Sequence, residues 1–365
     1  MSDSISPPAR GAGSATAVHW EDPRREQAFG QWLQGIAPRH GLDPATVHPA
    51  SADASFRRYL RVDGAQGSRI VMDAPPDKED CRPFVHVAGL MADAGLLVPR
   101  VLEWDEARGF MLLDDLGRQT MMEAIDPQQS EQAQPMYLRA IDALIAWQLS
   151  SGRGTLPPYD EALLNRELAL FPDWYLARHR KVAVEGKLRE TLDEAFRLIV
   201  RHNLSSPAVH VHRDFMPRNL MLPADPAERR LGVLDFQDAV HGPITYDIAS
   251  LMRDAFLTWD EEFVLDITVR YWEKALKAGL PVSADFGEFY RAVEWMGLQR
   301  HLKVAGIFAR LTLRDGKPKY LADTPRFIAY IRATAGRYRE LAPLLRLVDE
   351  IEGTQAVSGY AFGRL

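Results

Sequence analysis

The spacing of apolar residues changes abruptly at Asp114-Asp115-Leu116-Gly117, and this change limits the folds open to the chain. Before it, a helix predicted at 24–40 precedes short segments in which apolar and polar residues alternate, as they do in strands. Strands are predicted at 56–62, 69–72, 101–104 and 110–113, with a helix at 82–95. After it, helical spacing dominates, at about 132–151, 160–181, 187–203, 245–257, 260–278, 284–312 and 324–350. Two short apolar strands, at 208–211 and 231–234, interrupt these helices.

The order of these segments predicts an α+β fold in two lobes. A small antiparallel-sheet N-lobe would occupy residues 21–114, and a larger helical C-lobe residues 115–350. A chain of 365 residues is long enough to give each lobe a core. Residues 1–20 are rich in Ser, Ala, Gly and Pro and are expected to form a disordered tail, and residues 351–365 form a C-terminal tail.

Composition narrows the functional classes. The chain carries 44 Lys and Arg against 50 Asp and Glu, so it lacks the basic balance of a nucleic-acid-binding protein. Its single cysteine, Cys81, excludes an internal disulfide and a zinc site built of thiolates. The start of the chain does not read as a signal peptide, and no run approaches the roughly 18 apolar residues of a membrane helix. We therefore expect a cytoplasmic protein with no nucleic-acid or membrane partner, and the sequence indicates no obligate protein partner.

The most informative stretch runs from Val209 to Leu222. A short strand leads to His212 and Asp214, and Asn219 follows five residues after Asp214. A second apolar strand ends in Asp235, 21 residues beyond Asp214. The hairpin between Asn219 and Asp235 would bring both side chains to one edge. The alternative is an ordinary loop, in which His212 and Asp214 bond the backbone and Asn219 caps a turn.

These residue types suit phosphoryl transfer from ATP, which depends on in-line positioning and neutralised charge. Asp214 could orient an incoming hydroxyl group and accept its proton as the catalytic base. Oxygen atoms of Asn219 and Asp235 are the kind of ligand that Mg²⁺ prefers. His212 is interpreted as a neutral residue that braces the loop, because Asp214 has the position of the base.

His212-Arg213-Asp214 with Asn219 resembles the catalytic loop of protein kinases. The run from Asp235 to Tyr246-Asp247-Ile248-Ala249 is more similar to the aminoglycoside phosphotransferase and choline kinase-like superfamily. Segments 55–59, 72–76, 251–254 and 298–303 look like those of bacterial cell-wall amino-sugar kinases, which phosphorylate the anomeric hydroxyl of N-acetylmuramate and N-acetylglucosamine. The resemblance covers about residues 22–350.

This resemblance implies a bilobal protein-kinase-like fold and a Mg²⁺- and ATP-dependent kinase of peptidoglycan recycling, with ATP and a small sugar as its partners. It implies Asp214 as the catalytic base and Asn219 and Asp235 as magnesium ligands. It also implies that Asp247 is a structural acid that ties down the catalytic loop.

The chain departs from protein kinases in its first lobe. The turn that would cover the phosphates, residues 50–55, has no glycine, although Ser51 and Ser55 could approach phosphate; an ordinary hairpin turn is the alternative. The third strand ends in Asp73 where a phosphate-binding lysine is expected, and the following helix offers no glutamate. Arg57 or Arg58 could supply the missing positive charge, or both could be surface or sheet-packing residues.

Two further predictions concern the ligands. Residues 110–115 would form the interlobe hinge, where Met111 and Leu113 flank adenine; a plain edge strand is the alternative. For the sugar, Glu167 and Trp174 could share a helix face if Pro172 does not break the helix. Arg253 and Arg300 are further sugar-binding candidates, and Arg300 could bind a lactyl carboxylate. Each of these four residues could instead have a structural role, as part of an ion pair or as a helix cap.

Other functions remain open at this stage. Another kinase of the superfamily could act on an aminoglycoside, choline or an amino acid, although arginines among the candidate acceptor residues disfavour a polycation. A nucleotide-binding regulator without turnover would fit the missing lysine, but not the intact Asp214, Asn219 and Asp235. A protein kinase is disfavoured because only eight residues separate Phe236 from Thr245, too few for a peptide-binding segment.

Overall fold

The computed structural model describes residues 18–52, 56–152, 154–225 and 227–354. The chain divides into two compact units: residues up to Ala88 together with Pro99–Leu116 form the first, and Gly89–Val98 together with residues from Gly117 onward form the second. Among the described residues, no helix combines the length and the apolar character needed to cross a membrane.

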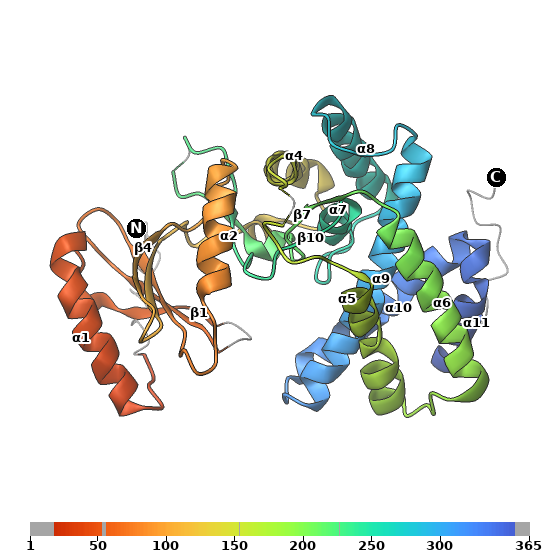
Figure 1. Ribbon diagram of the computed structural model, residues 1–365, viewed down its shortest axis with the longest axis horizontal. Helices are drawn as coiled ribbons and strands as arrows, with labels where there is room; N and C mark the ends of the chain where they lie inside the picture. The colour runs from red at the N-terminus through yellow and green to blue at the C-terminus, as the bar shows by residue number, and fades with distance from the viewer. Residues whose placement is uncertain (1–17, 53–55, 153, 226, 355–365) are drawn as a thin grey trace, which may run out of the picture. The chain divides into compact units, whose positions relative to one another are not determined.

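An antiparallel sheet of five strands forms the centre of the first unit (Figure 1). Its order is β1-β2-β3-β5-β4. Leu60 pairs with Val71, and Val71 pairs with Leu112, so three apolar side chains from neighbouring strands lie on one face of the sheet. The strands are β1 (His48–Ala52), β2 (Arg58–Val62), β3 (Arg69–Asp73), β4 (Val101–Asp105) and β5 (Phe110–Asp114).

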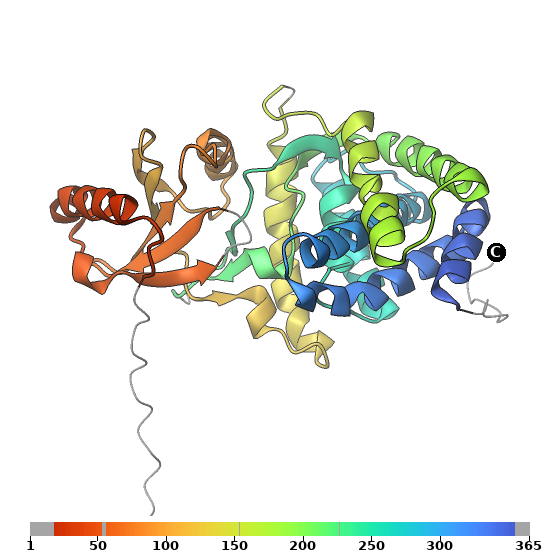
Figure 2. The ribbon, with the colours of Figure 1, turned by 90° about the horizontal axis from the view of Figure 1, so that it is seen from below.

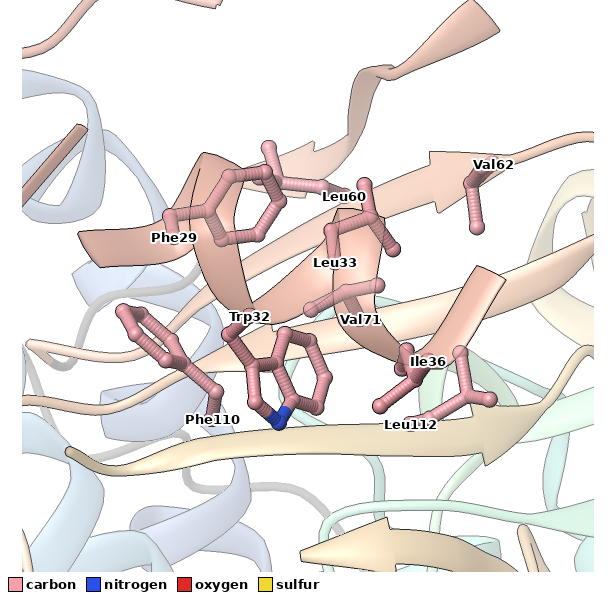
Figure 3. Close-up of a cluster of buried hydrophobic side chains, with 9 residues drawn as sticks. All are labelled: Phe29, Trp32, Leu33, Ile36, Leu60, Val62, Val71, Phe110 and Leu112. Atoms are coloured by element: carbon pink, nitrogen blue, oxygen red, sulfur yellow. The ribbon is translucent and has the colours of Figure 1, made fainter. Parts of the chain in front are cut away.

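Helix α1 (Pro23–His40) covers this face of the sheet. It begins where the Asp22 side chain accepts the N–H of Arg24, and it ends at Gly41, whose φ of 62° suits glycine. Figure 3 shows its apolar side chains against those of the strands; the buried cluster comprises Phe29, Trp32, Leu33, Ile36, Leu60, Val62, Val71, Phe110 and Leu112.

Val18 and Trp20 also pack against this cluster, and the Trp20 and Phe29 rings lie 5.0 Å apart. The packed chain therefore begins before the predicted tail boundary at residue 20. Residues 1–17 and 355–365, where tails are predicted, lie outside the described residues. The remaining elements of this region are the 3-10 helix η1 (Pro44–Thr46) and helix α2 (Arg82–Asp93), which runs across the division between the units.

The second unit is mostly helical, and its long helices pack against one another in Figure 2 (yellow-green to blue). Helix α9 packs against α6, α7, α8 and α10. The helices are α3 (Met121–Ala124), α4 (Ser130–Leu149), α5 (Glu161–Leu168), α6 (Gly186–Leu204), α7 (Thr245–Met252), α8 (Glu261–Lys277), α9 (Phe286–Leu313), α10 (Thr324–Arg337) and α11 (Ala342–Glu352). Shorter helical turns are the 3-10 helices η3 (Pro217–Asn219), η4 (Pro318–Asp323) and η5 (Arg339–Leu341).

Two small antiparallel sheets lie within this unit. Strand β7 (Ala208–Val211) pairs with β10 (Val240–Pro243). Strand β8 (Leu220–Leu222) pairs with β6 (Gln119–Thr120) and β9 (Gly232–Val233). Strand β7 leads the chain into the segment 212–235, and β8 and β9 form the hairpin within it that carries the candidate catalytic residues.

The helix predicted at 160–181 is wrong as one continuous element. The Asp160 side chain caps α5, which ends at Leu168, and a π-helix, η2 (Phe171–His179), follows. Pro172 has no backbone N–H, so it removes one hydrogen bond of an α-helix at this junction and favours the break. Helix α9 approaches this junction closely, because a Cβ atom added to Gly306 would lie 2.3 Å from the carbonyl oxygen of Leu170. Only glycine allows this approach.

Two other predicted helices are shorter than expected. The helix predicted at 245–257 ends at Met252, and the following Arg253 leaves helical geometry with φ −117° and ψ 57°. The helix predicted at 324–350 is broken at Tyr338, which has an extended backbone, into α10, η5 and α11. Residues 253–259 are therefore a loop beside the end of α7.

Candidate active site

The second unit brings Asp214, Asn219 and Asp235 together. The Asn219 side-chain nitrogen donates to the Asp214 carbonyl oxygen at 2.9 Å and lies 3.4 Å from a carboxylate oxygen of Asp235. The pairing of β8 with β9 produces this arrangement, because it places Leu220 opposite Val233 and lets the N–H of Leu234 donate to the Asn219 carbonyl at 2.9 Å. Residues 16 positions apart thereby share one edge of the hairpin.

The oxygen atoms at this edge fit a hard divalent cation. The Asn219 nitrogen is used in holding the loop, which leaves the carboxamide oxygen as a ligand beside the Asp235 carboxylate. Gln237 donates to the other Asp235 oxygen at 2.9 Å and so orients the carboxylate. Among the described residues, no group of three or more His, Cys, Asp or Glu side chains could hold a metal. A magnesium ion here would therefore also depend on phosphate oxygens.

His212 is neutral and fully engaged with the backbone. One ring nitrogen, Nε2, lies 3.0 Å from the Leu234 carbonyl, and the other, Nδ1, accepts the N–H of Asp214 at 3.2 Å. Burial lowers the pKa of His212 below its usual value. A neutral ring that donates from Nε2 and accepts at Nδ1 braces the loop and has no free nitrogen for a substrate proton.

Asp247, at the start of α7, holds the same loop from behind. Its two carboxylate oxygens accept the backbone N–H groups of His212, at 2.7 Å, and Arg213, at 3.0 Å. The Arg300 guanidinium donates to the Arg213 carbonyl at 2.7 Å. Arg213 has a φ of 77°, a left-handed conformation that is unusual for a side chain of this size. These three hydrogen bonds stabilise the left-handed backbone conformation at Arg213.

Glu167 lies in a buried cluster behind this loop. Its carboxylate accepts hydrogen bonds from Arg213 at 2.6 Å and Gln299 at 3.0 Å, and it pairs with Lys303 at 2.9 Å. Tyr159 supplies a further O–H donor. Burial alone would raise the pKa of Glu167, but Lys303 and Arg213 outweigh it and lower that pKa to about 2. Glu167 is thus an ionised support for the Arg213 side chain, so the structure does not present it as a sugar ligand.

The other predicted sugar contacts have separate surroundings. The half-exposed Trp174 ring is covered by the Arg178 guanidinium, 4.0 Å from the ring centroid, on the π-helix η2. Because η2 interrupts the α-helix, Trp174 does not continue the face of Glu167. Arg253 is buried and contacts the Glu261 and Glu294 carboxylates at 3.2 and 3.4 Å. Neither residue contacts the catalytic loop through these interactions.

The first unit contains the predicted nucleotide contacts. Arg58 forms an ion pair with buried Asp73, which also binds Arg25 at 2.5 Å, so Arg58 is already engaged in the sheet. Arg57 precedes β2 and is half-buried. Ser55 lies outside the described residues; the Ser51 backbone belongs to β1, but its side chain is not described.

Strand β5 lies between β3 and β4, so the alternative of a plain edge strand is wrong. Met111 and Leu113 are buried and pair with both neighbouring strands. Since these strand pairings use the backbone of β5 on both edges, backbone groups that bond adenine would have to follow Leu113. Asp114 still pairs with Arg69, and its N–H donates to the Arg100 carbonyl at 3.2 Å, so the nearest such residues follow Asp114.

The sequence did not predict that four side chains gather around Glu167; they are Tyr159, Arg213, Gln299 and Lys303. A signal was present for part of it, since Gln299 and Lys303 are polar residues within the otherwise apolar helix α9. Their common target, Glu167, lies 132 positions before Gln299, so the pairing depends on the tertiary fold.

A kinase-type catalytic loop on a helical unit, with a carboxylate and a carboxamide at one hairpin edge, defines a phosphotransferase. The model of the phosphotransferase enzyme family matches residues 46–282, and the chain belongs to this family. It is 50% identical over 343 residues to N-acetylmuramate/N-acetylglucosamine kinase of Pseudomonas aeruginosa, with 92% of this chain and 99% of that protein covered. The enzyme of the same name from Neisseria meningitidis is 47% identical over 342 residues, with 93% and 100% covered.

Solved structures of low sequence identity share the fold. A GDP complex of an aminoglycoside 2'-phosphotransferase has a TM-score of 0.58 at 13% identity, with 85% of this chain and 98% of that chain covered. An ethanolamine kinase of Plasmodium vivax has a TM-score of 0.57 at 12% identity, with 90% and 91% covered. These likenesses confirm the kinase-like fold class predicted from the sequence.

Proposed function

We propose that the protein phosphorylates the anomeric hydroxyl of N-acetylmuramate and N-acetylglucosamine with ATP and Mg²⁺, as a cytoplasmic enzyme of peptidoglycan recycling. The observation that carries the proposal is the arrangement of Asp214, Asn219 and Asp235 around one edge of the β8–β9 hairpin. Relatives about half identical to this chain over nearly its whole length bear the name of that activity. The sugar specificity is supported by these relatives, and the reaction type by the site itself.

In the proposed mechanism, Asp214 accepts the proton of the sugar hydroxyl as its oxygen attacks the γ-phosphorus of ATP, while the bond from that phosphorus to the β–γ bridging oxygen breaks and ADP leaves. Asn219 and Asp235 would hold Mg²⁺, which neutralises charge on the phosphate oxygens when it is bound. His212 and Asp247 keep the loop in shape, because both bond its backbone. These contacts fix the backbone at Asp214 before substrate arrives, and preorganisation of this kind lowers the barrier.

For the nucleotide, we propose that Arg57, directly before β2, supplies positive charge to the phosphates. Adenine would lie beside the apolar strand that contains Met111 and Leu113. These contacts rest on the superfamily resemblance and on the placement of each residue in the first unit. Exchange of Arg57 for glutamine, with measurement of the KM for ATP, tests the phosphate contact.

The test of the proposed function is a coupled assay with ATP, Mg²⁺ and a panel of acceptors: both sugars, choline and an aminoglycoside. Transfer to the anomeric oxygen removes the reducing end, and methyl glycosides of the same sugars should be inert. Asp214→Asn should lower kcat by roughly 10²–10⁴-fold, the usual scale for a positioned base. Asp193→Asn, on the surface of α6, is the matched control and should retain activity. Phosphorylation of choline or the aminoglycoside instead of the sugars would contradict the proposed sugar specificity.

A further inference from the structure

The catalytic loop exposes an arginine that the mechanism does not use. Arg218 lies in the 3-10 helix η3, directly before Asn219, and its side chain is exposed. Its guanidinium carbon lies 4.9 Å from the centroid of the Phe256 ring. Within the part of the chain that the structure describes, no carboxylate forms an ion pair with Arg218. The guanidinium therefore rests on an aromatic face and keeps its hydrogen-bond donors available.

The aromatic support is itself well anchored. Phe256 packs against Phe308 of α9, with ring centroids 6.0 Å apart. One carboxylate oxygen of Asp254 accepts the N–H groups of Phe256 and Leu257, the second at 3.0 Å. Asp254 is fully buried, so its two hydrogen bonds fix the backbone that carries the Phe256 ring. An arginine stacked on such a ring loses less side-chain entropy on binding a ligand than a free one does.

The two neighbouring side chains of η3 have different partners. Asn219 turns to the Asp214 carbonyl and to Asp235, where phosphate and metal would lie. Arg218 instead turns to Phe256, in the loop after α7. Arg218 thus places a positive charge in the catalytic loop, four residues after the proposed base Asp214, and it does not take part in the contacts of Asn219 with Asp214 and Asp235.

We propose that Arg218 binds the lactyl carboxylate of N-acetylmuramate, the group that N-acetylglucosamine lacks; this inference rests on the proposed function. Arg300, the candidate that sequence reasoning offered for this carboxylate, is buried and donates to the Arg213 carbonyl. Arg253 is buried among carboxylates. Arg218 combines exposure, a position in the catalytic loop and unused donors, and a guanidinium can bind a carboxylate through two parallel hydrogen bonds.

Exposure also explains how one site accepts a charged and a neutral sugar. A buried arginine would be left unpaired by N-acetylglucosamine, and an unpaired buried charge costs several kcal/mol. An arginine at the surface, stacked on Phe256, stays hydrated when the neutral sugar is bound. Arg218 should then favour N-acetylmuramate modestly without excluding N-acetylglucosamine, because exposed ion pairs are weak.

The test compares the two sugars in the variant Arg218→Gln. Its KM for N-acetylmuramate should rise about 3- to 5-fold, the upper scale of an exposed ion pair, with kcat nearly unchanged. Its KM for N-acetylglucosamine should stay within about twofold of the wild-type value. Arg218→Lys should recover part of the loss, because it keeps the charge but not the paired hydrogen bonds. Arg178→Gln, which removes a guanidinium stacked on Trp174, is the matched control and should change neither KM.

Ionic strength gives an independent measurement. Added salt should raise the KM of the wild-type enzyme for N-acetylmuramate, and this dependence should vanish in Arg218→Gln. An equal rise in both sugar KM values, or no rise in either, overturns the role of Arg218 and leaves the proposed function standing. A wild-type enzyme that phosphorylates neither sugar overturns the proposed function, and this inference with it. Circular dichroism of each variant confirms that the fold is retained.

Discussion

The Arg213 guanidinium donates to the Glu167 carboxylate at 2.6 Å, although the two residues are 46 positions apart in the chain. This contact joins the catalytic loop to α5 through a buried ion pair, and Lys303 on α9 shares the same carboxylate. The residue directly after Arg213 is the proposed base. The position of Asp214 therefore depends on a buried cluster behind the loop.

Glu167→Gln tests this dependence. The variant leaves the positive charges of Arg213 and Lys303 facing a neutral amide, which should lower the free energy of unfolding by about 3–5 kcal/mol. It should also lower kcat by about 10- to 100-fold, because even a small displacement of the base slows the reaction strongly. The KM for ATP should stay nearly constant. Urea unfolding and steady-state kinetics measure the two effects.

Glu294→Gln is the matched control for this experiment. Glu294 is as buried as Glu167 and pairs with Arg253 and Arg337, but these contacts do not reach the catalytic loop. It should lose a comparable free energy of unfolding and keep kcat within about threefold of wild type. Equal losses of kcat in both variants would show that activity follows general stability, and the positioning role of Glu167 would be rejected.

The close approach of α9 to the junction of α5 and η2 gives a second prediction. Gly306→Ala would place a methyl group against the Leu170 backbone, so the two elements must separate. Overpacking of this kind should lower the free energy of unfolding by about 1–3 kcal/mol. Gly297→Ala, on the same helix, meets only Arg253 Cδ at 3.5 Å and should be neutral or slightly stabilising. Thermal denaturation distinguishes the two, and an unaffected Gly306→Ala would show that the junction is looser than described.

A third prediction concerns pH and the buried ring of His301 in α9. Burial, assisted by Arg253, lowers the pKa of His301 to about 3, and the ring stacks on Tyr330 with centroids 4.5 Å apart. The unfolded chain binds a proton here near pH 6.5, so the stabilisation is present above that pH and is lost as the pH falls towards 3. Lowering the pH from 7 to 5 should therefore reduce the free energy of unfolding by about 2 kcal/mol through this residue.

His301→Gln removes the titrating group and should flatten this part of the stability profile. The difference between wild type and variant, measured by urea unfolding at several pH values, isolates His301 from the other histidines. The two curves should run parallel above pH 7, where the ring is neutral in both states. Parallel curves down to pH 5 would contradict the burial of a neutral ring.

Much of the fold could be predicted because its signals are local. The strands of the first unit alternate, so the face that contains Leu60, Val71 and Leu112 is visible in the sequence. The catalytic loop is compact in sequence as well, since Asp214 and Asn219 are five residues apart and one hairpin returns Asp235 to them. The predicted α+β fold class and phosphotransferase class, which depend on these local signals, are both confirmed.

The remaining features depend on contacts between distant residues. A π-helix and an α-helix present similar apolar spacing over nine residues, so the junction at 169–171 could not be read from the pattern alone. Glu167 has the same appearance in sequence whether it binds a sugar or an arginine. Its role becomes visible only when α5, α9 and the catalytic loop are placed together.

The backbone at Asp235 has one more consequence. Its φ is 63°, a conformation that glycine adopts freely and that asparagine and aspartate tolerate better than other residues. Of these three, aspartate alone offers a negative charge to a cation. Chain geometry and ion chemistry thus select the same amino acid independently. Alanine at this position would add conformational strain and remove the charge together. Asparagine would remove the charge and still tolerate the backbone conformation, so it is the more informative replacement in a study of metal dependence.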